Sequence, residues 1–140
     1  MQTASYIALA VLWIWFLGAV TTYRIGKWLL VEGEGLRSVE FGMLAAFTAA
    51  CVWYALSPAA GGWVLLGLLC LWLAAQFFSH WYYTLFGASE KKLRGYNEWF
   101  RGTLRLFPAS DTRLIPDLYH IILHLLLVIN MVLILTVMIQ

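Results

Sequence analysis

Three histidines are the residues of this sequence whose type and spacing are best suited to chemistry. His120 and His124 are four positions apart, so on a helix they project from one face. Asp117 lies three positions before His120 on the same stripe. His80 lies on an earlier apolar segment. Two imidazoles on one helix and a third on another is a ligand set that suits a catalytic zinc ion. The pattern predicts a divalent metal site, with zinc as the first candidate, whose ligands are His80, His120 and His124.

Polar residues near these histidines complete the candidate site. Asp117 and Glu40 are carboxylates that can serve as a fourth ligand, an orienting group or a general base, and Ser79 adds a hydroxyl beside His80. We therefore predict Asp117, Glu40 and Ser79 as catalytic residues. Two further residues on the helical stripe of His80 are expected to orient the ligands through hydrogen bonds: Gln76 and Tyr83.

The same histidines allow three interpretations. As metal ligands, they predict a metal-dependent hydrolase that acts on a lipid or another amphipathic substrate. As an axial pair, His80 with either His120 or His124 would bind haem b, which predicts an electron-transfer subunit. In the third interpretation the imidazoles only hydrogen-bond to neighbouring groups, as in a non-catalytic structural subunit of a larger membrane complex.

The distribution of charge predicts the elements that position these residues. Of the 140 residues, 63% are hydrophobic and only 11% are charged, whereas a soluble domain carries about 25% charged residues. Every charged residue lies within residues 24–40 or 90–117, so residues 1–23, 41–89 and 118–140 carry no formal charge. This composition excludes nucleic-acid binding, a secreted disulfide scaffold and a disordered chain.

The uncharged segments have the lengths of membrane-spanning helices, which need about 20 apolar residues each. The middle segment is long enough for two such helices, and a cluster of turn-forming residues at 57–62 divides it. We predict an all-α, polytopic membrane protein that forms one integral membrane domain, an up-down bundle of four transmembrane helices. The expected spans are residues 5–23, 39–57, 62–86 and 118–139.

The basic residues predict how the bundle is oriented. All nine Lys and Arg residues lie in the two charged loops, which are on the same side of an up-down bundle. By the positive-inside rule both loops are cytoplasmic and both termini lie outside, with a bacterial inner (plasma) membrane as the expected location. His80 and His124 are then each about 9 Å inside the cytoplasmic ends of their spans, at about 1.5 Å per residue. Ionisable groups inside a span are costly and are functional candidates by default.

The second charged loop contains a predicted amphipathic helix over residues 89–107. Its apolar residues recur at spacings of three and four, Ser89 is suited to cap its start, and Pro108 follows its end. Such a basic helix lies in the cytoplasmic headgroup layer, either as a surface anchor or as a lid over a site. The expected partners are membrane lipids, with a homo-oligomer or a larger membrane complex as the assembly.

Two features inside the spans predict how the helices pack. Gly42, Ala46 and Ala50 form a ladder of small residues, which indicates close packing of the second span against the third. Asn130 lies off the histidine stripe, so we expect its amide to bond to a neighbouring helix rather than to line a pathway.

The candidate site resembles, in residue types, the zinc site of the alkaline ceramidase and progestin-receptor-type superfamily, where a serine, an aspartate and three histidines meet near one membrane face. The counterparts by type are five residues: Ser79, His80, Asp117, His120 and His124. The resemblance implies zinc chemistry at one membrane face and no common fold, since that superfamily has seven spans. The length and topology also look like those of microsomal glutathione transferases. That family carries a motif with arginine and asparagine at the second span, and residues 37–40 of this chain retain too little of it to support membership.

Overall fold

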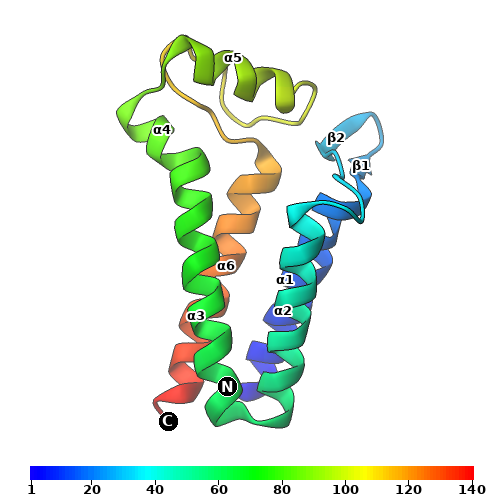
Figure 1. Ribbon diagram of the computed structural model, residues 1–140, viewed down its shortest axis with the longest axis vertical. Coiled ribbons are helices and arrows are strands. Elements are labelled where there is room, and N and C mark those ends of the chain that lie inside the picture. Colours follow the sequence, from blue (N-terminus) through cyan, green and yellow to red (C-terminus); the bar gives the residue numbers. More distant parts are fainter.

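A computed structural model describes all residues, 1–140, and four long helices make up most of it. They are α1 (Gln2–Thr21), α2 (Val39–Leu56), α3 (Pro58–Gln76), which continues without a break to Phe86, and α6 (Leu118–Met138). Each is long and apolar enough to cross a membrane. Both termini lie at one end of the bundle, and the charged connections lie at the other (Figure 1). The predicted all-α class and the four candidate spans are confirmed.

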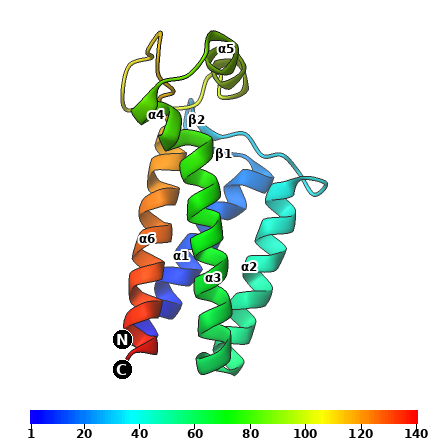
Figure 2. The ribbon, with the colours of Figure 1, turned by 60° about the vertical axis from the view of Figure 1, so that its left-hand side comes forward.

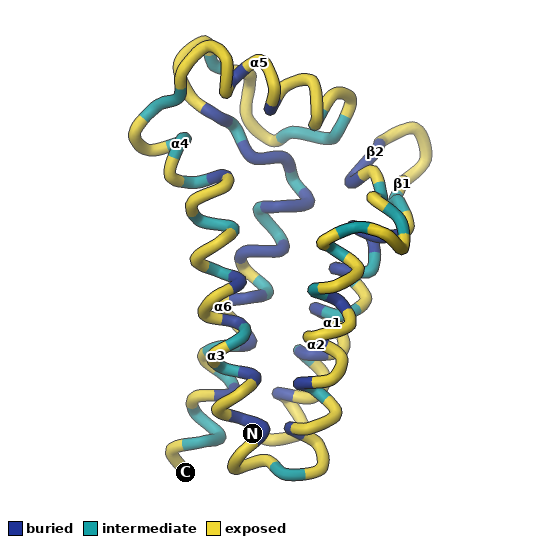
Figure 3. Tube along the Cα trace, viewed as in Figure 1, coloured by how far each residue is buried: buried dark blue, intermediate teal, exposed yellow.

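The four long helices form a ring in which each packs against two neighbours. The contacting pairs are α1 with α2, α2 with α3, α3 with α6, and α6 with α1. Their shared core is apolar, and its fully buried side chains include Leu12, Phe47, Leu65 and Leu127. Exposed positions follow the outward sides of the helices (Figure 3), and many of them carry large apolar side chains. A helix that is apolar on all sides is typical of a membrane span.

The turn between α2 and α3 is tighter than the sequence analysis expected. Only Ser57 separates the two helices, because Pro58 takes the first position of α3, where a missing N–H is no loss. The third span therefore begins at residue 58 and not at 62. A Cβ on Gly61 would lie 2.5 Å from the backbone of both Trp53 and Tyr54, so the close approach of the two helices requires glycine there.

A β-hairpin, absent from the sequence prediction, connects α1 to α2. β1 (Tyr23–Ile25) pairs with β2 (Trp28–Val31) in antiparallel fashion, and Gly26 forms the turn with a φ of 59°, which glycine adopts without strain. The backbone N–H of Leu104 donates to the carbonyl of Leu29 over 2.8 Å. The hairpin thereby ties the first charged loop to the second.

The amphipathic helix, α5, is shorter than predicted. It spans Glu90–Trp99, and the hydroxyl of Ser89 accepts a hydrogen bond from the backbone N–H of Lys92, which confirms the predicted cap. The helix ends at Trp99 rather than at residue 107, because the chain turns at Gly102, with a φ of 85°, and then runs beside the hairpin. α5 lies across the end of the bundle (Figures 1 and 2) and buries Leu93 toward it.

The predicted packing of α2 against α3 is confirmed, but the ladder expected to make the contact is wrong at two of its three positions. Gly42 and Ala46 are exposed, and a Cβ on Gly42 would meet nothing within 4 Å, whereas Ala50 is buried. The close approach of α2 and α3 is made at Gly61 instead. Asn130 is fully buried, and its Nδ2 donates to the carbonyl of Ala8 on α1 over 3.2 Å, as expected for a bond between helices.

Candidate functional site

The three histidines lie together at the end of the bundle that carries α5. The ring centroids of His80 and His120 are 4.2 Å apart, and those of His80 and His124 are 6.1 Å apart. All three side chains are buried. Residues from two helices that are far apart in the sequence thus form one cluster.

An irregular stretch of helix positions His80. Residues Phe77–Trp81 form a π-helical turn, η1, between α3 and the short helix α4 (Tyr82–Phe86). Such turns are rare and are frequent at functional sites. The turn changes the register of the side chains, so His80 is buried while the neighbouring Ser79 is exposed. The single stripe predicted for the third span is therefore split between two faces.

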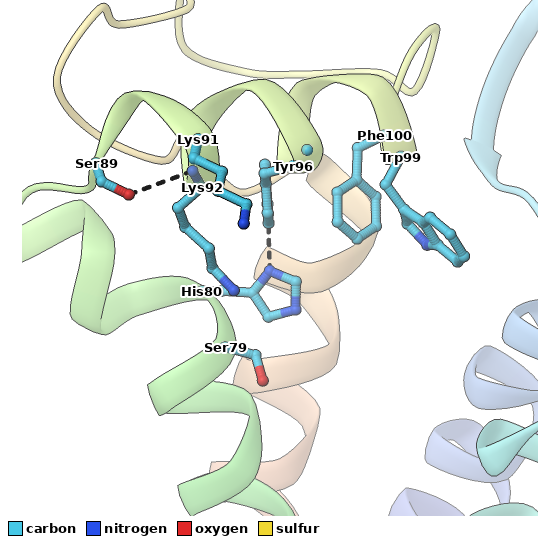
Figure 4. A pocket seen from close by; sticks show the side chains of 9 residues that line it. Ser79, His80, Ser89, Lys91, Lys92, Tyr96, Trp99 and Phe100 are labelled. Carbon is cyan, nitrogen blue, oxygen red and sulfur yellow. Dashed lines mark hydrogen bonds between the residues drawn. The ribbon is translucent and has the colours of Figure 1, made fainter.

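The Nδ1 atom of each histidine has a hydrogen-bonding partner. His80 Nδ1 lies 2.7 Å from the phenol oxygen of Tyr96 on α5 (Figure 4). His120 Nδ1 lies 2.7 Å from Oδ1 of Asp117, and His124 Nδ1 bonds to the carbonyl of His120. Carbonyl and carboxylate oxygens only accept, so the last two histidines carry a proton on Nδ1. In the neutral imidazole this leaves Nε2 with a free lone pair, which is the form that binds a metal.

Several buried acceptor atoms near the cluster lack a partner. Nε2 of His124, Oδ2 of Asp117 and Oε1 of Gln76 are all buried without a hydrogen bond. Buried polar atoms normally find partners, so such atoms call for an explanation. Imidazole nitrogen and carboxylate oxygen are both atom types that can bind zinc.

The side chains do not form a closed coordination sphere. No group of three or more His, Cys, Asp or Glu side chains converges closely enough to hold a metal ion. The rings of His80 and His120 lie 4.2 Å apart between their centroids and are tilted by 34°. The metal thus stays a prediction, supported by the kinds of donors and by their protonation.

Asp117 combines a structural role with a place in the cluster. Its Oδ1 accepts a hydrogen bond of 3.0 Å from the backbone N–H of His120, which caps the start of α6. The same oxygen pairs with the Nδ1 of His120. Because the carboxylate is almost fully buried, it fixes both the helix start and the orientation of the first imidazole on α6.

Two cavities reach the cluster, and Trp99 and Phe100 line both of them. The first has a volume of about 530 Å³ and lies between α5 and η1, where it reaches His80 (Figure 4). Its other polar lining residues, apart from Tyr96, are Ser79, Ser89, Lys91 and Lys92. Ser79, predicted as catalytic, thus shares a cavity with His80.

The second cavity has a volume of about 470 Å³ and is acidic. His120, Glu40 and Gln76 all line it, so two more of the predicted site residues share a cavity with one of the histidines. Three further glutamates line it: Glu32, Glu34 and Glu98. Tyr83 lines neither cavity, because its ring lies beneath the ammonium of Lys92, 4.9 Å from ring centroid to Nζ.

Tyr96 and Phe100 are site residues that the sequence analysis placed only on the apolar stripe of the amphipathic helix. The ring of Phe100 lies 5.8 Å from that of His80 and 5.1 Å from that of His120. Burial raises the pKa of Tyr96 above its ordinary value, so its hydroxyl is neutral at physiological pH. The sequence carries one signal for Tyr96, which is its place on the apolar stripe of the amphipathic helix. A tyrosine hydroxyl that is buried there usually needs a hydrogen-bonding partner.

Comparisons with protein-family models, with curated proteins and with solved structures give no match. The function is therefore argued from the residues and from the geometry of the site. The likeness in residue types to the seven-span zinc superfamily stays a likeness in chemistry alone.

Proposed function

We propose that this protein is an integral membrane protein that binds a divalent metal ion, zinc in the first instance, and hydrolyses a lipid or another amphipathic substrate. Its ligands are His80, His120 and His124. The observation that carries the proposal is the buried Nε2 of His124, which lacks a partner within a cluster whose Nδ1 atoms are all bonded. Histidines that bind metals usually have this arrangement, with the second ring nitrogen held by a carboxylate or a carbonyl.

The location in a membrane rests on the four apolar helices and on their apolar outer surface. All nine Lys and Arg residues belong to the two loops at the α5 end of the bundle. The positive-inside rule assigns that end to the cytoplasm and both termini to the outside, in a bacterial inner membrane. The histidine cluster then lies at the cytoplasmic leaflet, within reach of lipid headgroups.

When bound, a zinc ion supplies Lewis-acid chemistry, polarising an ester or phosphoester and making a water molecule acidic enough to react near neutral pH. The protein holds the ligands in the form that binds the ion. Asp117 fixes the tautomer and the orientation of His120. Tyr96 holds the orientation of His80 from α5, through the hydrogen bond between its hydroxyl and Nδ1 of His80.

Two of the remaining candidates have distinct roles in this proposal. Glu40 shares the acidic cavity with His120, and its carboxylate is the general base that takes a proton during hydrolysis. Ser79 shares the other cavity with His80 and donates a hydrogen bond to the substrate. The two groups thus act from opposite cavities on the same cluster.

The spacing of the rings favours a metal ion over haem. The ring centroids of His80 and His120 are 4.2 Å apart, which is close to van der Waals contact. If these two histidines were the axial ligands of a haem, the porphyrin would lie between their rings. The rings would then have to separate by the thickness of a further aromatic plane.

Chelation and restoration of the metal test this proposal. The purified protein in detergent is incubated with a total polar lipid extract, and the products are identified by mass spectrometry. We expect hydrolysis that is lost after chelation and restored by zinc, and Glu40→Gln is expected to reduce it about 10²- to 10⁴-fold. Glu32→Gln, from the same cavity, is the matched control and should keep activity.

Other outcomes would overturn the proposal in separable ways. Hydrolysis that survives chelation would remove the metal from the reaction. A Soret band in the visible spectrum would favour the electron-transfer subunit. A folded protein with no cofactor, which keeps its properties when the histidines are replaced, would be a structural subunit or a homo-oligomer without a metal site.

A further inference from the structure

The cavity between α5 and η1 has the size of a ligand site. Its volume of about 530 Å³ lies within the range of small-molecule pockets. Its deepest polar group is His80, which is 5% exposed, and Trp99 and Phe100 supply an aromatic wall. Figure 4 shows the side chains of Lys91 and Lys92 extending from α5 toward His80.

The charge of this cavity is wholly positive. Two lysines line it and no carboxylate does. Neither lysine forms a salt bridge, and Lys92 Nζ is held only over the ring of Tyr83. Unpaired ammonium groups that face a shared space attract an anion, and a phosphate offers several oxygens to bind them.

The second cavity excludes anions from the other side of the cluster. Four glutamates line it, so an anionic group that approaches His120 from there meets like charges. An anion can therefore approach the cluster favourably through the lysine cavity only.

Ser79, which lines the lysine cavity, lies beside an exposed aromatic surface of the long helix. Ser79 is exposed on the long helix, and exposed aromatic residues flank it: Phe78, Tyr82 and Phe86. Their rings follow one another along the helix, with centroids 6.0 Å and 5.0 Å apart. An acyl chain fits against such a surface while its headgroup lies in the cavity.

We propose that the cavity binds the anionic headgroup of a membrane phospholipid, with Lys91 and Lys92 on its phosphate and the lipid tails along the aromatic surface of α3 and α4. The assignment of this lipid as a substrate rests on the proposed function, because only a reactive centre at His80 would make it one. The binding itself does not depend on a metal.

Matched pairs of charge variants test the proposal. The protein in neutral detergent is titrated with phosphatidylglycerol or phosphatidylcholine, and bound lipid is counted by native mass spectrometry. Lys91→Gln with Lys92→Gln is expected to weaken phosphatidylglycerol binding by roughly tenfold or more. Arg24→Gln with Lys27→Gln removes the same charge from the hairpin, outside the cavity, and should leave binding unchanged. Lys91→Arg with Lys92→Arg should also retain it, which controls for folding.

Three results would overturn the proposal. They are equal losses in both glutamine pairs, equal affinity for the two lipids, and displacement of the lipid by inorganic phosphate, which would assign the cavity to a free anion. Metal content is measured on the same samples. Selective lipid binding by a protein that takes up no zinc would uphold this proposal and contradict the metal site, whereas zinc binding without lipid selectivity would do the reverse.

Discussion

The phenol oxygen of Tyr96 lies 2.7 Å from Nδ1 of His80, and this bond joins the amphipathic helix to the π-helical turn. Both side chains are buried. The position of α5 and the orientation of the imidazole are therefore coupled. Of the two roles expected for the amphipathic helix, this contact favours the lid over a plain surface anchor.

Replacing Tyr96 by phenylalanine tests this coupling. Phenylalanine keeps the ring and loses the hydroxyl, so the fold should be retained while zinc affinity falls about 10- to 100-fold, as for other groups that orient metal ligands. Competition with a chromophoric chelator measures the affinity. Tyr54→Phe is the control. It also removes a buried hydroxyl, which pairs with Ser5 at the end of the bundle opposite to α5. An equal loss in both variants would argue against a specific role for Tyr96.

The two roles of Asp117 are separable by substitution. Asparagine caps a helix as well as aspartate does, so Asp117→Asn should keep thermal stability and lose zinc affinity, since a neutral amide orients His120 less firmly. Asp117→Ala should lose both, with about 1 kcal/mol of stability from the lost cap alone. Thermal unfolding and zinc titration on each variant check this. Full zinc affinity in the asparagine variant would contradict the orienting role.

Cysteine labelling tests the orientation in the membrane. In a background with Cys51→Ala and Cys70→Ala, a membrane-impermeant maleimide added outside intact cells should label Ala60→Cys and not Lys92→Cys. Ala60 is exposed beside the α2–α3 turn, whereas Gly61 is unsuitable because a side chain there would meet the backbone of Trp53. Both sites should react once the cells are permeabilised. Labelling of Lys92→Cys from outside would invert the proposed orientation.

A pair of glycine substitutions tests how α2 and α3 meet. A Cβ on Gly61 would lie 2.5 Å from backbone atoms of α2, whereas one on Gly67 would meet nothing within 4 Å. Gly61→Ala should therefore lower stability by about 1–3 kcal/mol, and Gly67→Ala should leave it unchanged or raise it slightly. Thermal unfolding in detergent compares them. Equal stability of the two variants would mean that the helices are not closely packed at residue 61.

The sequence predicts the helices better than it predicts their contacts. Apolar length and the absence of charge are local properties, so the four long helices follow from them within a few residues. The face of each helix that packs into the core does not follow from the sequence, because every face is apolar and no polar stripe marks the outside. The ladder of small residues is therefore wrong at Gly42 and Ala46, although Ala50 is buried. The hairpin at Gly26 was not predicted, because it lies in a short charged loop.

For the candidate site, the sequence predicts the cluster and not its surroundings. His80 and His124 are predicted at one depth in their spans, and the spacing of four places His120 and His124 on one face of the last span. The π-helical turn shifts the register around His80, a change that a regular helical period does not contain. Tyr96 reaches His80 only through the docking of α5, which depends on the tertiary fold.

Zinc content per folded chain is the most direct test of the metal centre. The protein is purified in detergent after growth with zinc, passed through gel filtration, and assayed for bound metal by mass spectrometry. The account predicts about one zinc per chain, by analogy with mononuclear sites of three histidines, and its loss in His80→Ala, His120→Ala and His124→Ala. Folded wild-type protein without zinc, or the same zinc content in all three variants, would contradict it.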